Sequence, residues 1–312
     1  MFSRLPFVMF AASLCFAADL KLGFIGTDTS HVIAFTKVLN DPANPEHIAG
    51  ARMVAAFKGG SPDVESSANR VEGYAKELNE KWQVELVPSI SDLCGKVDAI
   101  LLESVDGRKH LPQVKEAARC GKPMFIDKPL ASTLEDAREI AKILKAANVK
   151  WFSTSSLRYG EIAMDMKFPD MIGATVWGPG PTEEHHHLSL SWYGIHAVEV
   201  LYSLLGTGAE EVSMVSSTDS DVVTAKWQGG KIGTVRAIRP YSDFGGVVFR
   251  AKSIVQSPAK PKYSYVAMLK QIVEFFQTGV VPVPNDVTME IFAFMDAAER
   301  SKAHGGAPMK LR

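Results

Sequence analysis

The sequence predicts an α/β protein with two domains: a doubly wound parallel sheet first, then an α+β domain built on a mostly antiparallel sheet. Three observations predict this class. The chain has 312 residues, more than one ordinary hydrophobic core requires. In its first half, short apolar runs alternate with amphipathic helical patterns. In its second half, β-type runs follow one another. We therefore expect domains at residues 18–150 and 151–312.

Residues 1–17 have the pattern of a secretory signal peptide. After a short, weakly positive start, Leu5–Phe16 is almost wholly apolar but too short to span a bilayer. Cys15 and Ala17 are small residues at positions −3 and −1 of a cut after Ala17. A lipoprotein anchor at Cys15 is an alternative, although the bulky Leu14 precedes it. We expect a mature protein that is exported, to the periplasm or the extracellular space, and that has no membrane segment.

Strands and helices alternate in the expected first domain. Its strand candidates are continuous apolar runs, which are typical of a parallel sheet covered on both faces. They are Lys21–Ile25, Met53–Phe57, Ala99–Leu102 and Met124–Ile126. One helix is predicted to begin near His31. Another places Leu134 and Leu144 on one face and begins at a capping box of Ser132 and Glu135.

The expected second domain contains four strand candidates and three helices. The strands are Val212–Ser217, Val222–Trp227, Lys231–Ile238 and Val247–Val255. Gln228–Gly230 reads as a hairpin turn between two of them. The helices are Ile195–Leu205, Ser264–Gln277 and Asp286–Ala303, the last with Asn285 as N-cap. A doubly wound domain followed by such a domain leaves a cleft at the strand C-termini, where ligands bind.

Composition limits the partners of the chain. The formal net charge is -1, so no basic field exists to hold nucleic acid or an anionic lipid surface. After signal cleavage Cys94 and Cys120 remain, and their pairing cannot be read from the sequence. These features favour a small-molecule ligand.

The first strand–loop–helix carries an incomplete dinucleotide fingerprint. The pattern G-x-G-x-x-G would place glycines at three positions, but only Gly26 is present. Asp28 takes the place of the second glycine, where a carboxylate repels phosphate unless it is turned away or caps the helix. His31 takes the place of the third. We assign Gly26, Thr27, Asp28, Ser30 and His31 to a Rossmann-like cofactor loop; the alternative is a plain helix start capped by Asp28 or Ser30.

The end of the second strand bears on the choice of cofactor. An NAD enzyme commonly places an acidic residue there, whereas this chain has Lys58 followed by small residues. Lys58 could hold a 2′-phosphate and favour NADP over NAD; the alternative is a solvent-facing turn. Glu103, just after the third strand, is a further candidate for the cofactor side.

Asp127-Lys128-Pro129 is the most informative stretch. It ends a strand at the edge of the cleft, where partial burial can lower the pKa of Lys128. Asp127 can support the ammonium group, and Pro129 fixes the turn, with a cis bond as one option. A surface Lys-Pro in a loop is the alternative, but the position in the strand–helix order favours a ligand site.

These motifs resemble the Gfo/Idh/MocA oxidoreductases, which include glucose–fructose oxidoreductase and inositol dehydrogenase. Asp127–Pro129 is similar to their Glu-Lys-Pro element, and Gly194–Val198 to their Gly-x-His helix start. The ending Gly305–Met309 also fits. The resemblance implies an NAD(P)-dependent enzyme that oxidises or reduces a sugar or polyol.

The same resemblance implies roles for three catalytic residues. Lys128 would polarise or orient the reacting oxygen, and His196 would serve as the acid/base. Where the family usually has Asp, this chain has Tyr193, whose pKa near 10 suits a base poorly.

The substrate side has weaker signals. In Glu183–His187 a strand would place His185 and His187 on one face, where they could bind zinc with a carboxylate. No matching ligand spacing recurs, so we predict a polar wall of the substrate cleft and no metal site. Arg158 and Tyr159 are further candidates for contacts to substrate.

Three functions remain open at this point. The first is an exported NAD(P)-dependent oxidoreductase acting on a sugar, polyol or derivative. The second is a secreted ligand-binding protein that kept the fold and lost the cofactor, and the third is an NAD-assisted glycoside hydrolase. Family analogy also suggests a homo-oligomer.

Overall fold

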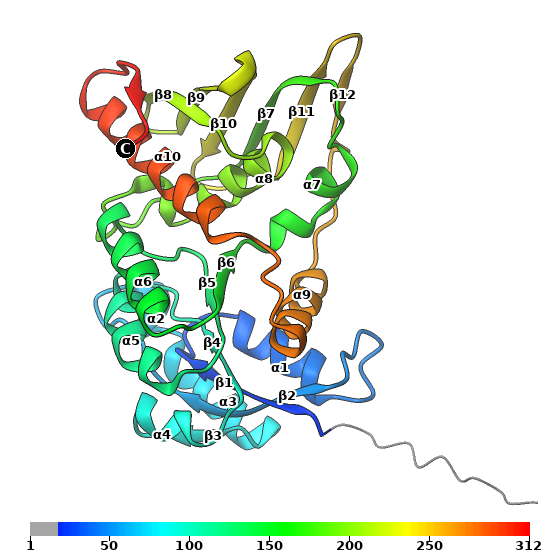
Figure 1. The fold of residues 1–312 in the computed structure, drawn as a ribbon, viewed down its shortest axis with the longest axis vertical. Coiled ribbons are helices and arrows are strands. Elements are labelled where there is room, and N and C mark those ends of the chain that lie inside the picture. Colours follow the sequence, from blue (N-terminus) through cyan, green and yellow to red (C-terminus); the bar gives the residue numbers. More distant parts are fainter. Residues whose placement is uncertain (1–17) are drawn as a thin grey trace, which may run out of the picture.

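The fold consists of two stacked sheets with helices between and around them (Figure 1). The computed structural model describes residues 18–312, so the predicted signal peptide lies outside the described residues. Within residues 18–312 no helix is long and apolar enough to cross a membrane.

The N-terminal sheet has six parallel strands in the order β3-β2-β1-β4-β5-β6. The strands are β1 (Leu20–Ile25), β2 (Ala51–Phe57), β3 (Glu85–Val87), β4 (Ala99–Leu102), β5 (Met124–Asp127) and β6 (Trp151–Thr154). This is the doubly wound order, in which the chain reverses direction beside β1 and ligands bind at the strand C-termini. The predicted fold class of the first domain is confirmed.

Helices cover both faces of this sheet. On one face Phe24, Leu78 and Leu269 share a core, contributed by β1 and by helices on that side. On the other face Ile100, Val114 and Ile140 belong to the second core. The helices of this region are α1 (His31–Asn40), α2 (Glu65–Ala68), α3 (Val71–Trp82), α4 (Ile90–Cys94), α5 (His110–Ala117), α6 (Leu134–Ala146) and α9 (Tyr265–Thr278).

The C-terminal half contributes two elements to the first sheet. Strand β6 begins at Trp151 and pairs with β5, so the sheet ends after Thr154 and not at residue 150. Helix α9 follows all but the last short strand of the second sheet in sequence, yet it packs against α1. The predicted division at residue 150 therefore does not coincide with the packing of the first domain.

The second sheet has seven strands in the order β12-β11-β7-β10-β9-β8-β13. All neighbouring pairs are antiparallel except β7 and β10, which run parallel, so the predicted mostly antiparallel α+β domain is confirmed. The strands are β7 (Met171–Pro179), β8 (Ala209–Ser216), β9 (Ser220–Trp227), β10 (Ile232–Ile238), β11 (Gly245–Arg250), β12 (Ile254–Gln256) and β13 (Met309–Lys310). Gln228–Gly230 joins β9 to β10, as predicted.

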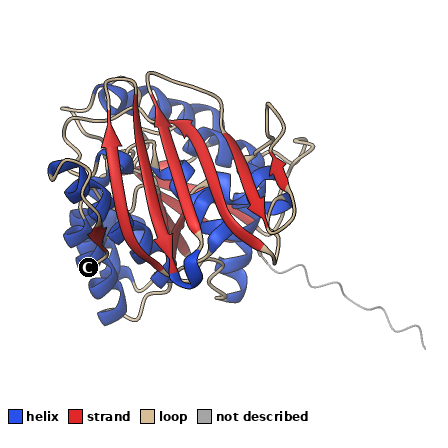
Figure 2. Cartoon of the chain, turned by 90° about the horizontal axis from the view of Figure 1, so that it is seen from above, coloured by secondary structure: helices blue, strands red, loops and turns tan. Residues whose placement is uncertain are grey.

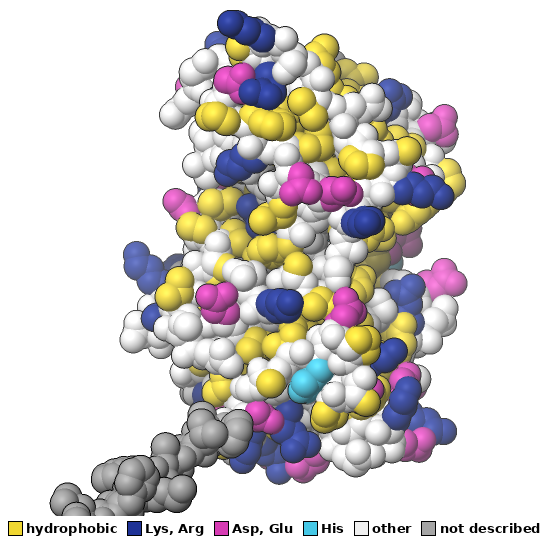
Figure 3. Space-filling view, turned by 90° about the vertical axis from the view of Figure 1, so that its right-hand side faces the viewer, with side chains coloured by type: hydrophobic (Ala, Val, Ile, Leu, Met, Phe, Trp, Pro, Cys, Tyr) yellow, Lys and Arg dark blue, Asp and Glu magenta, His cyan; other side chains and the backbone are white. Residues whose placement is uncertain are grey.

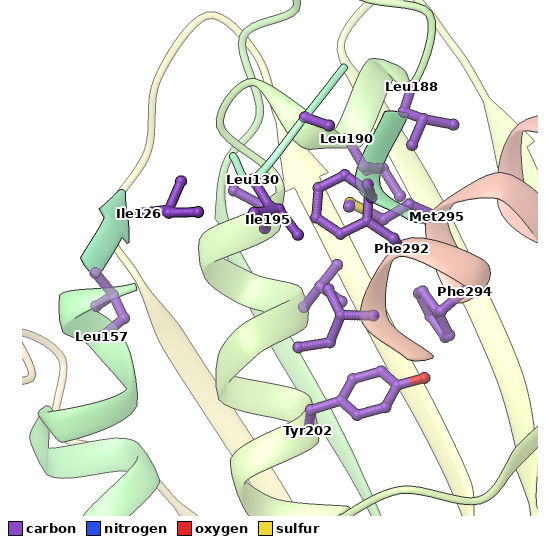
Figure 4. Close-up of a cluster of buried hydrophobic side chains, with 14 of the residues drawn as sticks. Ile126, Leu130, Leu157, Leu188, Leu190, Ile195, Tyr202, Phe292, Phe294 and Met295 are labelled. Carbon is purple, nitrogen blue, oxygen red and sulfur yellow. The ribbon is translucent and has the colours of Figure 1, made fainter. Parts of the chain in front are cut away.

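Helices cover one face of the second sheet and leave the other open (Figure 2). The covering helices are α7 (Glu161–Asp165), α8 (Ile195–Leu205) and α10 (Asn285–Ala303). Figure 4 shows Ile195 of α8 near Phe292 and Met295 of α10, and Tyr202 further along α8 on the side of Phe294, all within the larger hydrophobic core. On the open face Val215, Ile232 and Ile254 are 67%, 55% and 69% exposed. Figure 3 shows another side of the molecule, where charges of both signs are interspersed among hydrophobic side chains.

Local signals place most elements within a few residues. The capping box is shifted by one residue, because the side chain of Thr133, not Ser132, accepts from the backbone N–H of Asp136 at 3.0 Å. The predicted strand Val247–Val255 is a hairpin of β11 and β12. Strands β3, β6, β7 and β13 were not predicted.

A disulfide joins Cys94, at the end of α4, to Cys120, just after α5. The two Cα atoms are 5.3 Å apart, and the bridge closes a span of 26 residues. It links two helices on one face of the first sheet. The sequence left this pairing open.

Candidate functional site

A cavity of about 440 Å³ lies where the two domains meet, at the C-terminal ends of the parallel strands. Its volume falls within the range of small-molecule sites. Both domains contribute to its walls. The lining residues are Thr29, Ser30, His31, Ser66, Arg70, Val105, Lys128, Ser156, Leu157, Trp192, Tyr193, His196, Tyr241, Phe244, Tyr263 and Tyr265. The three predicted catalytic residues are therefore together in one cavity.

Lys128 comes directly after β5 and enters the cavity from the first domain. The peptide bond to Pro129 is cis. Burial lowers the pKa of Lys128, and the negative charges of Asp127 and Glu103 counteract only part of this effect. The ammonium Nζ lies 5.6 Å from the ring centre of Tyr193, on the opposite wall, a cation–π distance.

His196 enters from the second domain, in the first turn of α8. Its Nδ1 lies 2.6 Å from Oγ of Ser155, which also accepts from the backbone N–H of Leu157 at 3.1 Å. In either tautomer, Nε2 is the ring nitrogen left for a ligand. Burial, reinforced by the charge of Lys128, holds the pKa of His196 well below its usual value, so the ring is neutral at pH 7. Sequence reasoning missed Ser155, because its role depends on a contact between the domains.

Tyr193 takes part in an aromatic wall. Burial, followed by nearby tyrosines, raises the pKa of Tyr193 to about 12, which makes it a worse base than free tyrosine. Its ring centre is 5.0 Å from that of His196 and 6.3 Å from that of Tyr241. The other aromatic residues of this wall are Phe244, Tyr263 and Tyr265. Phe244 directly precedes β11, whereas Tyr263 and Tyr265 lie at the entry to α9, so two segments far apart in the sequence supply them.

The loop after β1 is closely packed at Gly26. Its φ is +92°, and an added Cβ would lie 2.5 Å from the backbone nitrogen of Ser104. Only glycine fits this position. The hydroxyl of Thr27 donates to the backbone oxygens of Lys58 and Val71 at 3.2 Å each, so its side chain is engaged in holding the loop.

Asp28 is turned away from the cavity. Its buried carboxylate accepts from Oγ of Ser67 at 2.6 Å and from the backbone N–H of Val105 at 3.2 Å. Burial raises the pKa of Asp28 despite these bonds. Neither Asp28 nor Ser30 caps α1 with its side chain, so the capped-start alternative is wrong for both residues.

The start of α1 opens into the cavity through Thr29, Ser30 and His31. Arg70, just before α3, lines the same space. A helix N-terminus together with a guanidinium group is suited to bind phosphate. Arg70 was not predicted, because this residue lies outside the dinucleotide fingerprint.

Lys58 occupies the solvent-facing turn that was the alternative to a 2′-phosphate site. Its Nζ forms a salt bridge of 2.6 Å with Oε1 of Glu72, and both side chains are largely exposed. Lys58 does not line the cavity described above. The structure gives no support for choosing NADP over NAD.

His31, Glu103 and Asp127 form a buried cluster at the inner wall. Nδ1 of His31 is 2.8 Å from Oδ2 of Asp127 and 3.5 Å from Oε2 of Glu103. Burial lowers the pKa of His31, but the two carboxylates outweigh it and raise that pKa well above its usual value. Burial, with the charge of Asp127, raises the pKa of Glu103 to about 8. Asp127 was expected to support Lys128; its charge does raise the pKa of Lys128, while its Oδ2 lies against His31.

The predicted substrate residues do not line this cavity. The Nε of Arg158 donates to Oε2 of buried Glu199 at 2.8 Å, which is a structural ion pair. Tyr159 packs against the core beneath α9. Their positions after β6 gave no sign of these partners.

The segment Glu183–His187 forms a turn, so the strand interpretation is wrong. Nδ1 of His185 lies 2.6 Å from Oε1 of Glu183, and His187 is exposed. The histidine that faces inward is His186, whose Nε2 lies 3.0 Å from Oδ1 of Asp106. His185 and His187 therefore do not form a polar wall of the cavity.

Comparison with known proteins agrees with this geometry. Residues 46–155 match the family model GFO_IDH_MocA, described as an oxidoreductase family with an NAD-binding Rossmann fold. This segment of the chain is thus similar to the Gfo/Idh/MocA oxidoreductases. The inositol 2-dehydrogenase of Paracoccus denitrificans is 29% identical over 163 residues, which cover 50% of this chain and 43% of that protein. The 1,5-anhydro-D-fructose reductase of Ensifer adhaerens is 37% identical over 95 residues, covering 30% and 27%. The matches thus span less than half of either relative.

Solved structures show the same fold over nearly the whole chain. The scyllo-inositol dehydrogenase of Lactobacillus casei with bound NAD(H) and scyllo-inositol has a TM-score of 0.74 at 12% identity, covering 94% of this chain and 99% of that one. The WlbA dehydrogenase of Bordetella pertussis, in complex with NADH and UDP-GlcNAcA, has a TM-score of 0.73 at 17% identity, covering 95% and 99%. At these identities the likeness establishes the fold.

Proposed function

We propose that this protein is an NAD(P)-dependent oxidoreductase that acts on a hydroxyl-bearing carbon of a sugar, polyol or derivative. One observation carries the proposal: Lys128 from the first domain and His196 from the second line the same cavity, which also contains the open start of α1. Two relatives act on an inositol and on an anhydro sugar, by their names.

The residues present fit a dinucleotide. Gly26 allows the close packing of the loop, and the Asp28 carboxylate is bonded to Ser67 and Val105 instead of facing the cavity. Backbone groups at Ser30 and the guanidinium of Arg70 would hold the pyrophosphate. When bound, the nicotinamide supplies the hydride acceptor or donor.

His196 and Lys128 would manage the proton and the substrate oxygen. In the neutral tautomer whose Nδ1–H donates to Ser155 Oγ, Nε2 of His196 would accept a proton from a substrate hydroxyl and later return it. The Lys128 ammonium would orient the same oxygen and stabilise negative charge on it. Tyr193 would hydrogen-bond a hydroxyl, since its raised pKa excludes base duty at neutral pH.

A binding protein without turnover is the second candidate. Two observations favour it. Asp28 and His31 replace glycines of the dinucleotide fingerprint, and Tyr193 stands where the Gfo/Idh/MocA oxidoreductases usually have Asp. Such a protein would use the same aromatic wall to hold a sugar ring, because aromatic faces and tyrosine hydroxyls suit that ligand.

We also propose export, with the signal peptide at residues 1–17 removed. The Cys94–Cys120 disulfide supports this, because disulfides persist in oxidising compartments. Mass spectrometry of the protein isolated from its native cell fraction tests it. A new N-terminus at Ala18 is expected, and an intact Met1 in a cytoplasmic fraction would contradict export.

The open sheet face with Val215, Ile232 and Ile254 is the surface through which a homo-oligomer would form.

Cofactor retention separates the two candidate functions. Purified protein is denatured, and the released small molecules are identified by mass spectrometry and absorbance. NAD(P) in the supernatant supports the oxidoreductase. A thermal shift with added NAD or NADP supports it too, when a panel of polyols then reduces the added cofactor. Absence of both retention and thermal shift contradicts it and leaves the binding protein.

A further inference from the structure

The His31–Glu103–Asp127 cluster has no part in the chemistry proposed above. Its members come from the start of α1, the residue after β4 and the end of β5. These elements follow adjacent strands of the first sheet, so their C-terminal ends meet at one edge. One potential ligand atom from each residue lies within 4.8 Å of the other two. All three side chains are buried.

The bonding capacity of this cluster is not satisfied. Both carboxylate oxygens of Glu103 and Oδ1 of Asp127 have no hydrogen-bond partner within residues 18–312. Buried carboxylates without donors are costly, and native proteins pair the great majority of such atoms. A positively charged ligand between these oxygens would remove the deficit.

Nδ1 of His31 is in the same situation. It lies 2.8 Å from Oδ2 of Asp127 as an ion pair, but within the described part of the chain this contact does not have the geometry of a hydrogen bond. The oxygen therefore lies beside the bonding direction of the nitrogen and not along it. That direction remains available to a metal ion that both atoms share.

The distances fit shared coordination. Two atoms bound to one Zn²⁺ at about 2.1 Å lie roughly 3.0–3.4 Å apart in octahedral or tetrahedral geometry. The measured separations from Nδ1 of His31 are 2.8 Å to Asp127 and 3.5 Å to Glu103. One imidazole and two carboxylates form a donor set that Zn²⁺ and Mn²⁺ accept.

We propose that His31, Glu103 and Asp127 bind one divalent transition-metal ion, Zn²⁺ or Mn²⁺, at the inner wall of the cavity. Because His31 also lines the cavity, the site adjoins the space where a substrate oxygen would lie. The ion would neutralise the two carboxylates and could act on that oxygen as a Lewis acid. This proposal does not depend on the binding of NAD(P).

Calorimetric titration of tag-free, chelator-treated protein with ZnCl₂, and separately with MnCl₂, tests the site. We expect one equivalent of at least one ion to bind with a micromolar or tighter Kd. Glu103→Gln keeps the shape and removes one ligand charge, so it should weaken binding at least tenfold. His185→Gln, at the exposed turn where Glu183 and His185 could hold a metal adventitiously, is the matched control and should leave the affinity unchanged.

Two outcomes overturn the proposal: no stoichiometric binding of either ion, or binding that His185→Gln removes and Glu103→Gln does not. In the first case the Lys128 ammonium and a protonated His31 alone balance the carboxylates. If Glu103→Gln does not fold, X-ray absorption of the zinc-loaded wild type decides. One imidazole with oxygen ligands supports the site, whereas two or more imidazoles contradict it. None of these measurements uses NAD(P), so failure here is separate from failure of the oxidoreductase assignment.

Discussion

Two buried clusters in this protein combine histidine with carboxylate, and they differ in how far their polar atoms are satisfied. Asp106 accepts hydrogen bonds from Ser61 Oγ at 2.8 Å and from Arg108 Nη2 at 2.7 Å, and lies 3.0 Å from Nε2 of His186. In the cluster of His31, Glu103 and Asp127, four side-chain atoms have no hydrogen-bond partner within residues 18–312. The first cluster is a completed structural network, and the second retains capacity for a ligand. Residue types alone do not distinguish them.

The largest effect should be on turnover, and it should come from Lys128, which directly follows Asp127 of the cluster with unsatisfied atoms. Replacing Lys128 with Met keeps the length of the side chain and removes the ammonium group. We expect turnover to fall by about 10²–10⁴-fold, as for the loss of a residue that assists proton transfer. Stability should change little, because the lysine lines a cavity. Steady-state kinetics and thermal unfolding measure the two effects. Lys81→Met, on an exposed i,i+4 pair with Glu77, is the control. Unaltered kcat in Lys128→Met would remove the assigned role.

A substitution in the network around Asp106 should instead lower the stability of the protein. Asp106→Asn leaves Arg108 and His186 with an uncharged partner in a buried position. We expect the free energy of unfolding to fall by about 3 kcal/mol, as when one partner of a buried ion pair is removed. Glu103→Gln should cause no comparable loss, since no bond made by Glu103 side-chain oxygens is broken. Urea denaturation of both variants measures the difference, and equal losses would abolish the distinction between the clusters.

The disulfide tests whether the same side of the first domain depends on covalent support. The double substitution Cys94→Ser and Cys120→Ser opens a span of 26 residues that includes Asp106. We expect a loss of about 3 kcal/mol from the greater entropy of the unfolded chain. A lower Tm in this variant, together with a similar decrease for the wild type in reductant, is the expected result. A Tm insensitive to both changes would show that packing alone holds α4 against α5.

The smallest effect concerns pH. Burial alone would raise the pKa of Asp106, but hydrogen bonds from His186, Arg108 and Ser61 outweigh it and hold the pKa well below its usual range. The ionised carboxylate therefore contributes its full stability above about pH 5, where an aspartate of the unfolded chain is also ionised, and loses it as the pH falls through about 4 toward the lower folded pKa. The stability difference between wild type and Asp106→Asn should shrink between about pH 5 and pH 3. A constant difference would mean that Asp106 has an ordinary pKa.

The sequence predicted the two-domain class and most elements, because those signals are local. Periodicity located β1, β4 and α8 to within two residues, and the hairpin at Gln228–Gly230 has its own glycines. The missed strands lacked such a signal. Strand β3 has three residues and a mostly exposed pattern, and β6 reads Trp-Phe-Ser-Thr, which is only half apolar although wholly buried.

The site was predictable only where a motif carried it. Lys128 and His196 stand in short motifs of recognisable order, and the cavity includes both. Arg70 and Ser155 belong to no such motif and act through contacts between segments far apart in the chain. Arg158 and His185 have side chains suited to bind a ligand, but each contacts a carboxylate of the protein instead. The partner of Arg158 is Glu199, and that of His185 is Glu183.

The position of α9 makes the first domain depend on the last part of the chain. Met268, Leu269 and Ile272 complete the core over Phe24 and Phe35, and the ring of Tyr265 is centred 4.6 Å from that of His31. A ribosome must therefore have made almost the entire polypeptide before the first sheet can shield that face from water. Under the export proposed above, this order would delay compaction until late in synthesis. A fragment ending at residue 150 would lack α9 and expose a hydrophobic surface, so we expect it to aggregate instead of binding a nucleotide.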